Sequence, residues 1–254
     1  MLHAAALTRL RPKAPGRVAS VARQYGTSVR KRDPRTLVTS GLFAALILEA
    51  LAFGHITEDY LTGDPIVRWD VHFATWLHEH ASSSLVNVFE VVTYAGNALV
   101  LGVVILTAAA LLLRRGRLND AALLVAAFGG AVVVNGLLKL LFHRRRPELS
   151  FVHLDTYSFP SGHAAAAAAT FTAGAWLLAL RHRDTRARVL IVLAAALLIV
   201  IVGFSRLYLG AHYLSDVLAG FSFGLGWATL CLIGYTLLGE RDLRKVVFGG
   251  RRAG

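Results

Sequence analysis

The chain has 254 residues, a formal net charge of +12, and 56% hydrophobic residues. Soluble domains are about 45–50% apolar, and the mean hydropathy here is +0.56. The apolar residues come in long blocks, and the polar stretches between them are too short to form a soluble core. The composition therefore excludes a soluble globular protein and indicates one integral membrane domain.

An all-α, polytopic fold is predicted, because six apolar blocks approach the roughly 20 residues that cross a bilayer core of ~30 Å. The six predicted transmembrane helices are residues 37–56, 86–113, 121–142, 164–180, 189–209 and 214–238. The predicted domain is 36–239, with a basic N-terminal tail at 1–35 and a C-terminal tail at 240–254.

The basic residues are distributed unevenly between the two sides of this predicted bundle. All but six of the 27 Lys and Arg lie on the side that carries both termini. The positive-inside rule therefore places both termini in the cytoplasm of a multi-pass plasma-membrane protein. The charge is explained by topology, and nucleic acid is excluded as a partner because no soluble fold presents a basic surface.

Two features near the N-terminus and the last span have simple interpretations. Residues 1–35 are expected to be a tail that attracts anionic headgroups. Cleavage after Ala50-Leu51-Ala52 is the alternative, but the basic leader is long for a signal peptide. The single Cys231 cannot form an intramolecular disulfide, so we interpret it as a packing residue.

The longest outer connection is residues 57–85, where acidic and aromatic residues mix with apolar ones. Asp70 to His80 can form an amphipathic helix on the membrane surface, with its aromatic rings at headgroup depth. The inner loops at 114–120 and 181–188 are short, so each should join two antiparallel neighbouring helices.

Three polar clusters lie at the outer ends of the last four predicted spans. The first contains Lys139, followed seven residues later by Arg146 and then Pro147. If the helix continues that far, Lys139 and Arg146 share a face to within about 20°. Pro147 disfavours helix at the preceding residue and marks the exit from regular structure.

The second cluster is Pro160-Ser161-Gly162-His163, directly before the fourth span. A helix N-terminus has free N–H groups and a positive dipole end, which suit an anion. Gly162 allows close approach of the backbone to a ligand, and Ser161 can cap the helix.

The third cluster runs from Ser205 to Asp216. Arg206 falls in the last turn of the fifth span, and Gly210 turns the chain. His212 and Asp216 are four residues apart, so on a helix they share a face, and the carboxylate could hold one ring nitrogen while the other stays free. Alone, each cluster could be ordinary: a snorkelling cation, a surface histidine or a helix cap. Five of the six basic residues on the sparse side fall in these clusters, and together they predict an oxyanion site.

The three clusters resemble the signature of the type 2 phosphatidic acid phosphatase family, which shares its site with the vanadium haloperoxidases. The family pattern is Lys, six residues, Arg-Pro; then Pro-Ser-Gly-His; then Ser-Arg, five residues, His, three residues, Asp. Every defining position is filled in residues 139–216. The resemblance implies a helical core of this family and a phosphatase acting on lipids.

The resemblance also implies roles for individual residues. His212 would form a phosphohistidine, Asp216 would orient it, and His163 would be the general acid and then the general base. The phosphoryl oxygens would be bound by five further residues: Lys139, Arg146, Ser161, Gly162 and Arg206. No cofactor or metal is expected, because three fixed cations can do what Mg²⁺ does elsewhere and would repel a metal. Arg144 and Arg145 are interpreted as contacts to headgroups or the substrate tail.

A site at the outer membrane surface suits a lipid whose phosphate lies at headgroup depth. A polyprenyl diphosphate such as undecaprenyl diphosphate is the first expectation, with phosphatidic acid and phosphatidylglycerophosphate as alternatives. A lipid phosphotransferase could use the same phosphohistidine. A non-enzymatic membrane scaffold is disfavoured, because it would not need Lys139, His163, His212 and Asp216.

Overall fold

The computed structural model describes residues 34–63, 65–152 and 154–248, and no strand occurs among them. Two units are distinguished, Met1–Leu37 and Val38–Gly254, and the arrangement below concerns the second. The predicted tails stay predictions, since most of 1–35 and residues 249–254 lie outside the described ranges. The elements are α2 (Pro34–Thr62), α3 (Pro65–Glu79), α4 (Ser83–Val92), η1 (Thr93–Gly96), α5 (Ala98–Arg114), α6 (Leu118–Phe142), α7 (Gly162–Ala179), α8 (Thr185–Tyr208) and α9 (Leu214–Phe248).

The all-helical, membrane-spanning fold is confirmed, whereas the count of six spans stays a prediction. Four helices are long and apolar enough to cross a membrane, and a fifth span is added if a bent pair is counted as one. That pair is Ser83–Gly96 with Ala98–Arg114, which meet at 42°. The second span was expected to be continuous, and this was wrong. Asn97 caps α5 by accepting from the N–H groups of Leu99 and Val100.

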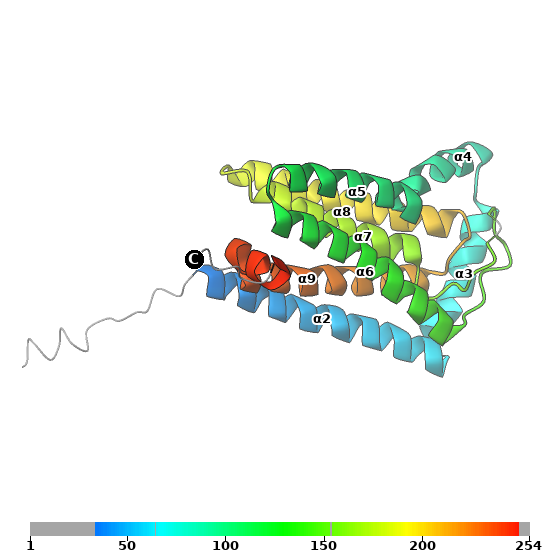
Figure 1. Cartoon of the computed structure of the whole chain (residues 1–254). Helices are drawn as coiled ribbons and strands as arrows, with labels where there is room; N and C mark the ends of the chain where they lie inside the picture. Colours follow the sequence, from blue (N-terminus) through cyan, green and yellow to red (C-terminus); the bar gives the residue numbers. More distant parts are fainter. Residues whose placement is uncertain (1–33, 64, 153, 249–254) are drawn as a thin grey trace, which may run out of the picture. The chain divides into compact units, whose positions relative to one another are not determined.

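Helix α7 is the inner helix of the bundle and packs against α6, α8 and α9 (Figure 1). Its alanines from Ala164 to Ala169 are buried, which lets neighbouring backbones approach closely. On α9, a Cβ at Gly224 would lie 2.4 Å from the carbonyl oxygen of Ala165, and one at Gly220 2.6 Å from that of Ser161. Small residues on both helices therefore bring the start of α9 against the start of α7.

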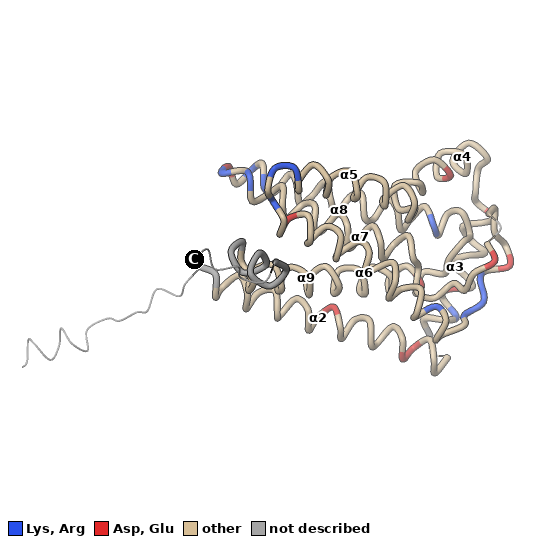
Figure 2. The backbone as a smooth tube through the Cα atoms, viewed as in Figure 1, with Lys and Arg blue, Asp and Glu red and all other residues tan. Residues whose placement is uncertain are grey.

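The expected helix pairs are confirmed, because α5 packs against α6 and α7 against α8. In Figure 2, Lys and Arg gather where these pairs are connected, and a second group lies at the opposite ends, near the end of α6. The basic residues of the three predicted clusters belong to that second group. The ends of α6 and α8 and the starts of α7 and α9 thus meet on one side of the bundle.

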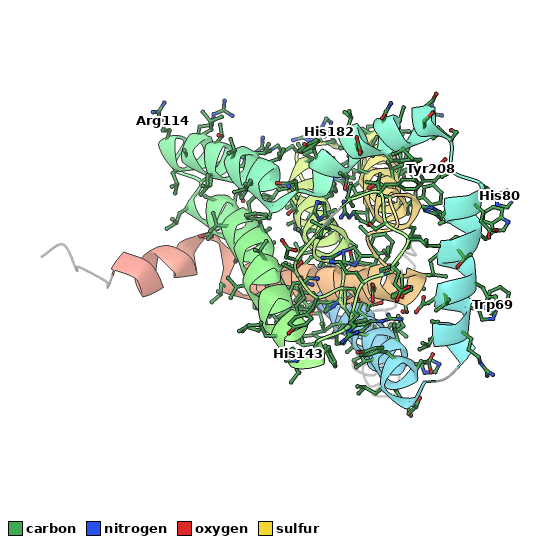
Figure 3. All side chains as sticks on the ribbon, turned by 90° about the vertical axis from the view of Figure 1, so that its right-hand side faces the viewer. Trp69, His80, Arg114, His143, His182 and Tyr208 are labelled. Atoms are coloured by element: carbon green, nitrogen blue, oxygen red, sulfur yellow. The ribbon has the colours of Figure 1, made fainter. Side chains whose placement is uncertain are left out.

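Helix α3 runs across the ends of α8 and α9, against which it packs (Figure 1). It corresponds to the amphipathic helix predicted at Asp70 to His80, but it begins earlier, at Pro65, shortly after α2 ends at Thr62. Asp70 and Leu77 are buried on its inner face. Trp69 and His80, the latter just beyond its end, project away from the other helices (Figure 3). Its place on a membrane surface stays a prediction.

Candidate active site

The first cluster extends past the end of a helix into a loop and is not one continuous helix. Helix α6 ends at Phe142, and His143 adopts a left-handed conformation with a φ of 49°. The helix does not continue to Arg146, so Lys139 and Arg146 do not share a helical face, and the chain leaves regular structure before Pro147, as predicted. The Lys139 ammonium donates to the carbonyl oxygens of Tyr157 and Ser158, the latter at 3.3 Å.

Arg146 reaches the same segment from the loop side. Its Nε donates to the carbonyl oxygen of Thr156 at 2.6 Å, and its Nη2 donates to that of Tyr157 at 3.3 Å. Its Nη1 donates to the carbonyl oxygen of Ala211 at 2.6 Å and lies 3.2 Å from Nε2 of His212. The segment 156–158 thus brings the two cations together, and Arg146 joins them to the third cluster.

The second cluster sits at the start of α7, as predicted, but Ser161 does not cap the helix with its side chain. Ser161 occupies the N-cap position without a side-chain capping bond. Its N–H donates instead to the carbonyl oxygen of Asp216 at 2.9 Å. A Cβ at Gly162 would lie 3.1 Å from Oδ1 of Asn135 and 3.9 Å from Cε of Lys139. The glycine therefore lets α7 begin next to the end of α6.

Arg206 and His163 are both contacted by the break between α4 and α5. Nη1 of Arg206 donates to the hydroxyl of Thr93 at 2.7 Å. A Cβ at Gly96 would lie 3.2 Å from the carbonyl oxygen of His163 and 2.3 Å from a methyl group of Val202. Sequence reasoning missed Thr93 and Gly96. A signal for the helix break was present, since Gly96-Asn97 interrupts an apolar block with a residue that permits a turn and one that caps helices.

His212 lies in the bend before α9 and not on the helix, which corrects the predicted shared face. Its Nδ1 nevertheless lies 3.4 Å from Oδ2 of Asp216. Asp216 is the third residue of α9, and its Oδ2 accepts from the N–H of Tyr213 at 2.9 Å. This is the reciprocal half of a capping box, which fixes the bend that carries the histidine.

The pKa of His212 is affected by burial and by cations of the other clusters. Burial lowers the pKa of His212 well below its usual value, and nearby charged groups lower it further. These groups are Lys139, Arg146 and Arg206. A neutral imidazole keeps a ring lone pair at neutral pH. Of the five side chains predicted to converge, Arg146 and His212 are thus in contact, and the full convergence stays a prediction.

Arg144 is not a headgroup contact, and this expectation was wrong. Only 6% of its surface is exposed, and Asp70 and Asp216 are fully buried beside it. Nη1 donates to Oδ1 of Asp216 at 2.6 Å, and Nη2 donates to Oδ2 of Asp70 at 2.7 Å. Burial disfavours the charge, but the two carboxylates outweigh burial and raise the pKa of Arg144. Arg145 is exposed.

Several buried polar atoms around this centre lack a hydrogen-bond partner among the residues that the structure describes. They include Oγ of Ser161, Nε of Arg206 and Nδ1 of His212. Buried polar atoms are nearly always paired, so unpaired ones require an explanation. A hydroxyl and a guanidinium N–H are both donors that an anionic oxygen would satisfy.

The chain is similar in sequence and in fold to known proteins of one family. The model of the PAP2 superfamily matches residues 120–239, which contain all eight predicted site residues. The match covers 120 of the 254 residues, slightly less than half of the chain. The resemblance predicted from the three clusters is thus confirmed. Asp70, Thr93 and Gly96, which contact the PAP2 residues, lie outside the matched range.

Two curated relatives are lipid phosphatases by name. Phosphatidylglycerophosphatase B of Bacillus subtilis (strain 168) is 39% identical over 95 residues, or 36% of this chain and 46% of that protein. Lipid A 1-phosphatase of Rhizobium etli is 39% identical over 105 residues, or 37% of this chain and 40% of that protein. The chain spans less than half the length of each.

A solved structure covers more of the chain. It is the crystal structure of a transmembrane PAP2 type phosphatidylglycerolphosphate phosphatase from Bacillus subtilis, with a TM-score of 0.64 and 27% identity. The similarity covers 75% of this chain and 94% of that one. With the apolar helices described above, it identifies this chain as a multi-pass membrane protein.

Proposed function

We propose that this protein is a metal-independent lipid phosphatase that works through a phosphohistidine on His212. The observation that carries the proposal is that contacts join the three clusters at one side of the bundle. Arg146 lies 3.2 Å from His212, and the N–H of Ser161 donates to the carbonyl oxygen of Asp216. Phosphoryl transfer needs mainly positioning and charge stabilisation. Fixed cations supply the charge without reorganising during the reaction.

In the first step, Nε2 of His212 attacks phosphorus while the bond from phosphorus to the lipid-side oxygen breaks. Burial and the neighbouring cations lower the pKa of His163 to about 3 in the empty site, so His163 takes up a proton as the anionic substrate binds. It then gives this proton to the leaving oxygen, and the lipid product leaves with a hydroxyl or as a monophosphate. The phosphoryl oxygens lie between Lys139, Arg146 and Arg206, and they accept from Oγ of Ser161 and the N–H of Gly162. The unpaired Oγ of Ser161 and Nε of Arg206 support this assignment.

In the second step, His163 takes a proton from water, and the water oxygen attacks phosphorus. The bond from phosphorus to Nε2 breaks, inorganic phosphate leaves, and His212 returns to its neutral state. Asp216 holds the Nδ1 side of the ring, which its position 3.4 Å away allows. The positive charge of the phosphohistidine is then balanced by the buried carboxylate.

We place the site on the extracytoplasmic face of the plasma membrane and both termini in the cytoplasm. The distribution of Lys and Arg supports this orientation. A site facing outwards suits recycling of a polyprenyl carrier, so undecaprenyl diphosphate is the proposed first substrate. The relatives' names add phosphatidylglycerophosphate and lipid A 1-phosphate as the substrates to compare with it.

The test is release of phosphate by purified protein from these three lipids, with and without EDTA. We expect turnover of at least one lipid in EDTA, and loss of turnover in His212→Ala and His163→Ala. His182→Ala, in the connection between α7 and α8, is the matched control and should keep full activity. Turnover that survives in His212→Ala, or that requires Mg²⁺, would contradict the mechanism.

A further inference from the structure

The group that holds Asp216 from the side away from His212 is Arg144. Its guanidinium carbon lies 4.8 Å from the ring centroid of Tyr60 and 4.5 Å from that of Tyr213. Aromatic faces attract a guanidinium, and two of them limit its movement. Arg144 is therefore a buried cation with a fixed plane.

The fixed plane determines how its hydrogen bonds are used. One end of the fork donates to Oδ1 of Asp216, and the other donates to Oδ2 of Asp70. Nη1 also donates to the hydroxyl of Ser215 at 2.7 Å. A guanidinium matches carboxylates through such a rigid fork, which a lysine cannot reproduce.

Asp70 in turn ties α3 to the first turn of α9. Its Oδ1 accepts from the N–H of Ser215 at 2.8 Å, and its Oδ2 accepts from the hydroxyl of the same serine. Asp70, Arg144 and Ser215 thus form a closed, buried network. Buried charges without partners are costly, so removing any one member would disturb the others.

The network fixes the rotation of the Asp216 carboxylate. Oδ1 is occupied by Arg144, which leaves Oδ2 for the N–H of Tyr213 and for Nδ1 of His212. A carboxylate free to rotate would lose the geometry that holds the imidazole. This matters only if His212 attacks phosphorus, so the inference rests on the proposed function.

We propose that Arg144 and Asp70 are positioning residues, which hold Asp216 in the orientation that directs His212 at the phosphoryl group. Asp70 comes from α3 and Tyr60 from α2, both outside the residues matched to the PAP2 superfamily. Through Asp70, helix α3 therefore contributes to catalysis, although it does not touch the reacting atoms.

The test compares Arg144→Gln, Arg144→Lys and Asp70→Asn with Arg145→Gln, a change of the adjacent exposed arginine. Rates are measured on the monodisperse fraction, together with thermal unfolding and product inhibition by inorganic phosphate. Residues that orient metal-binding side chains typically contribute about 10- to 100-fold to activity, and we expect the same range for residues that orient Asp216. We expect kcat to fall by that factor in Arg144→Gln and Asp70→Asn, with KM within about threefold. Arg144→Lys keeps the charge but not the fork, and should lie between.

Inorganic phosphate separates positioning from a purely structural role. As a product it binds the cation cluster without a bond to His212, so its inhibition constant should stay within about threefold of the parent value. A fall in kcat of less than about fivefold in both Arg144→Gln and Asp70→Asn overturns the inference, and so does an equal loss of phosphate affinity. If Arg144→Gln does not fold, Asp70→Asn decides by the same criteria. Failure of the proposed function is a different result: the parent protein releases no phosphate, or His212→Ala stays active.

Discussion

Replacing Ser161 by alanine should change stability and activity in opposite directions. A serine at an N-cap normally stabilises its helix, and Ser→Ala there costs about 0.5–2 kcal/mol. Ser161 makes no such bond, and its hydroxyl is buried without a partner among the described residues. Its backbone N–H bond to Asp216 does not depend on the side chain. The usual cost of losing a cap is therefore absent.

The magnitudes follow from the burial of this hydroxyl. An unsatisfied buried polar group costs about 1–3 kcal/mol. Ser161→Ala should therefore leave the free energy of unfolding of the substrate-free protein unchanged, or raise it by up to that amount. With substrate, the variant loses a hydrogen bond to a charged oxygen, worth about 1.5–3 kcal/mol. At about 1.36 kcal/mol per factor of ten, kcat/KM should fall roughly 10- to 150-fold.

Asp184→Ala is the matched control, because the Asp184 side chain makes capping hydrogen bonds and the Ser161 side chain does not. Asp184 is the N-cap of α8, and its carboxylate accepts from the N–H groups of Arg186 and Ala187. This variant should lose about 1 kcal/mol of stability and keep its kcat/KM. The assays are thermal unfolding in detergent without substrate and initial rates of phosphate release. If Ser161→Ala were destabilised like the control, or if it kept its activity, the hydroxyl would not be reserved for an anion.

Three further predictions concern packing, the helix break and pH. Gly224→Ala should cost about 1–3 kcal/mol in thermal unfolding, because its Cβ meets a backbone carbonyl of α7, whereas Gly234→Ala, with no atom within 4 Å, should not. Thr93→Val removes the acceptor of Arg206 and should lower kcat/KM about tenfold in initial-rate assays, with an unchanged value as the contrary result. The lowered pKa of His212 keeps its ring neutral at lower pH, so the acid limb of kcat/KM assigned to this residue should lie below pH 6.5; a midpoint at or above that value would contradict this.

The composition and the three clusters were sufficient to predict the membrane fold and the gathering of the site. Apolar blocks predict helices because a bilayer core leaves no other way to satisfy the backbone. Lys139, His163 and His212 could be grouped without the structure, because each falls at the outer end of a predicted span. Helix ends on the same side of a compact bundle lie close together because the helices pack against one another.

The buried residues that contact Asp216 from the side of α3 could not be predicted in the same way. Asp70 and Arg144 are 74 positions apart, and Arg144 is one of three consecutive arginines. Which arginine turns inward depends on the left-handed turn at His143, which no residue type in that run requires. One signal for Asp70 did exist. With Phe73 and Leu77 it shares one face of α3, and a carboxylate on an apolar face needs a buried partner.

The proposed phosphate-binding residues cannot by themselves select the lipid. In the proposed mechanism, Lys139, Arg146 and Arg206 bind a phosphoryl group, which is the same in phosphatidylglycerophosphate, lipid A 1-phosphate and a polyprenyl diphosphate. The two relatives whose names specify different lipids each match little more than a third of this chain. Specificity therefore requires contacts beyond the three clusters. Helices α2 and α3 already reach the site through Tyr60 and Asp70, so substitutions on their surfaces should alter which lipid is hydrolysed before they alter the chemistry.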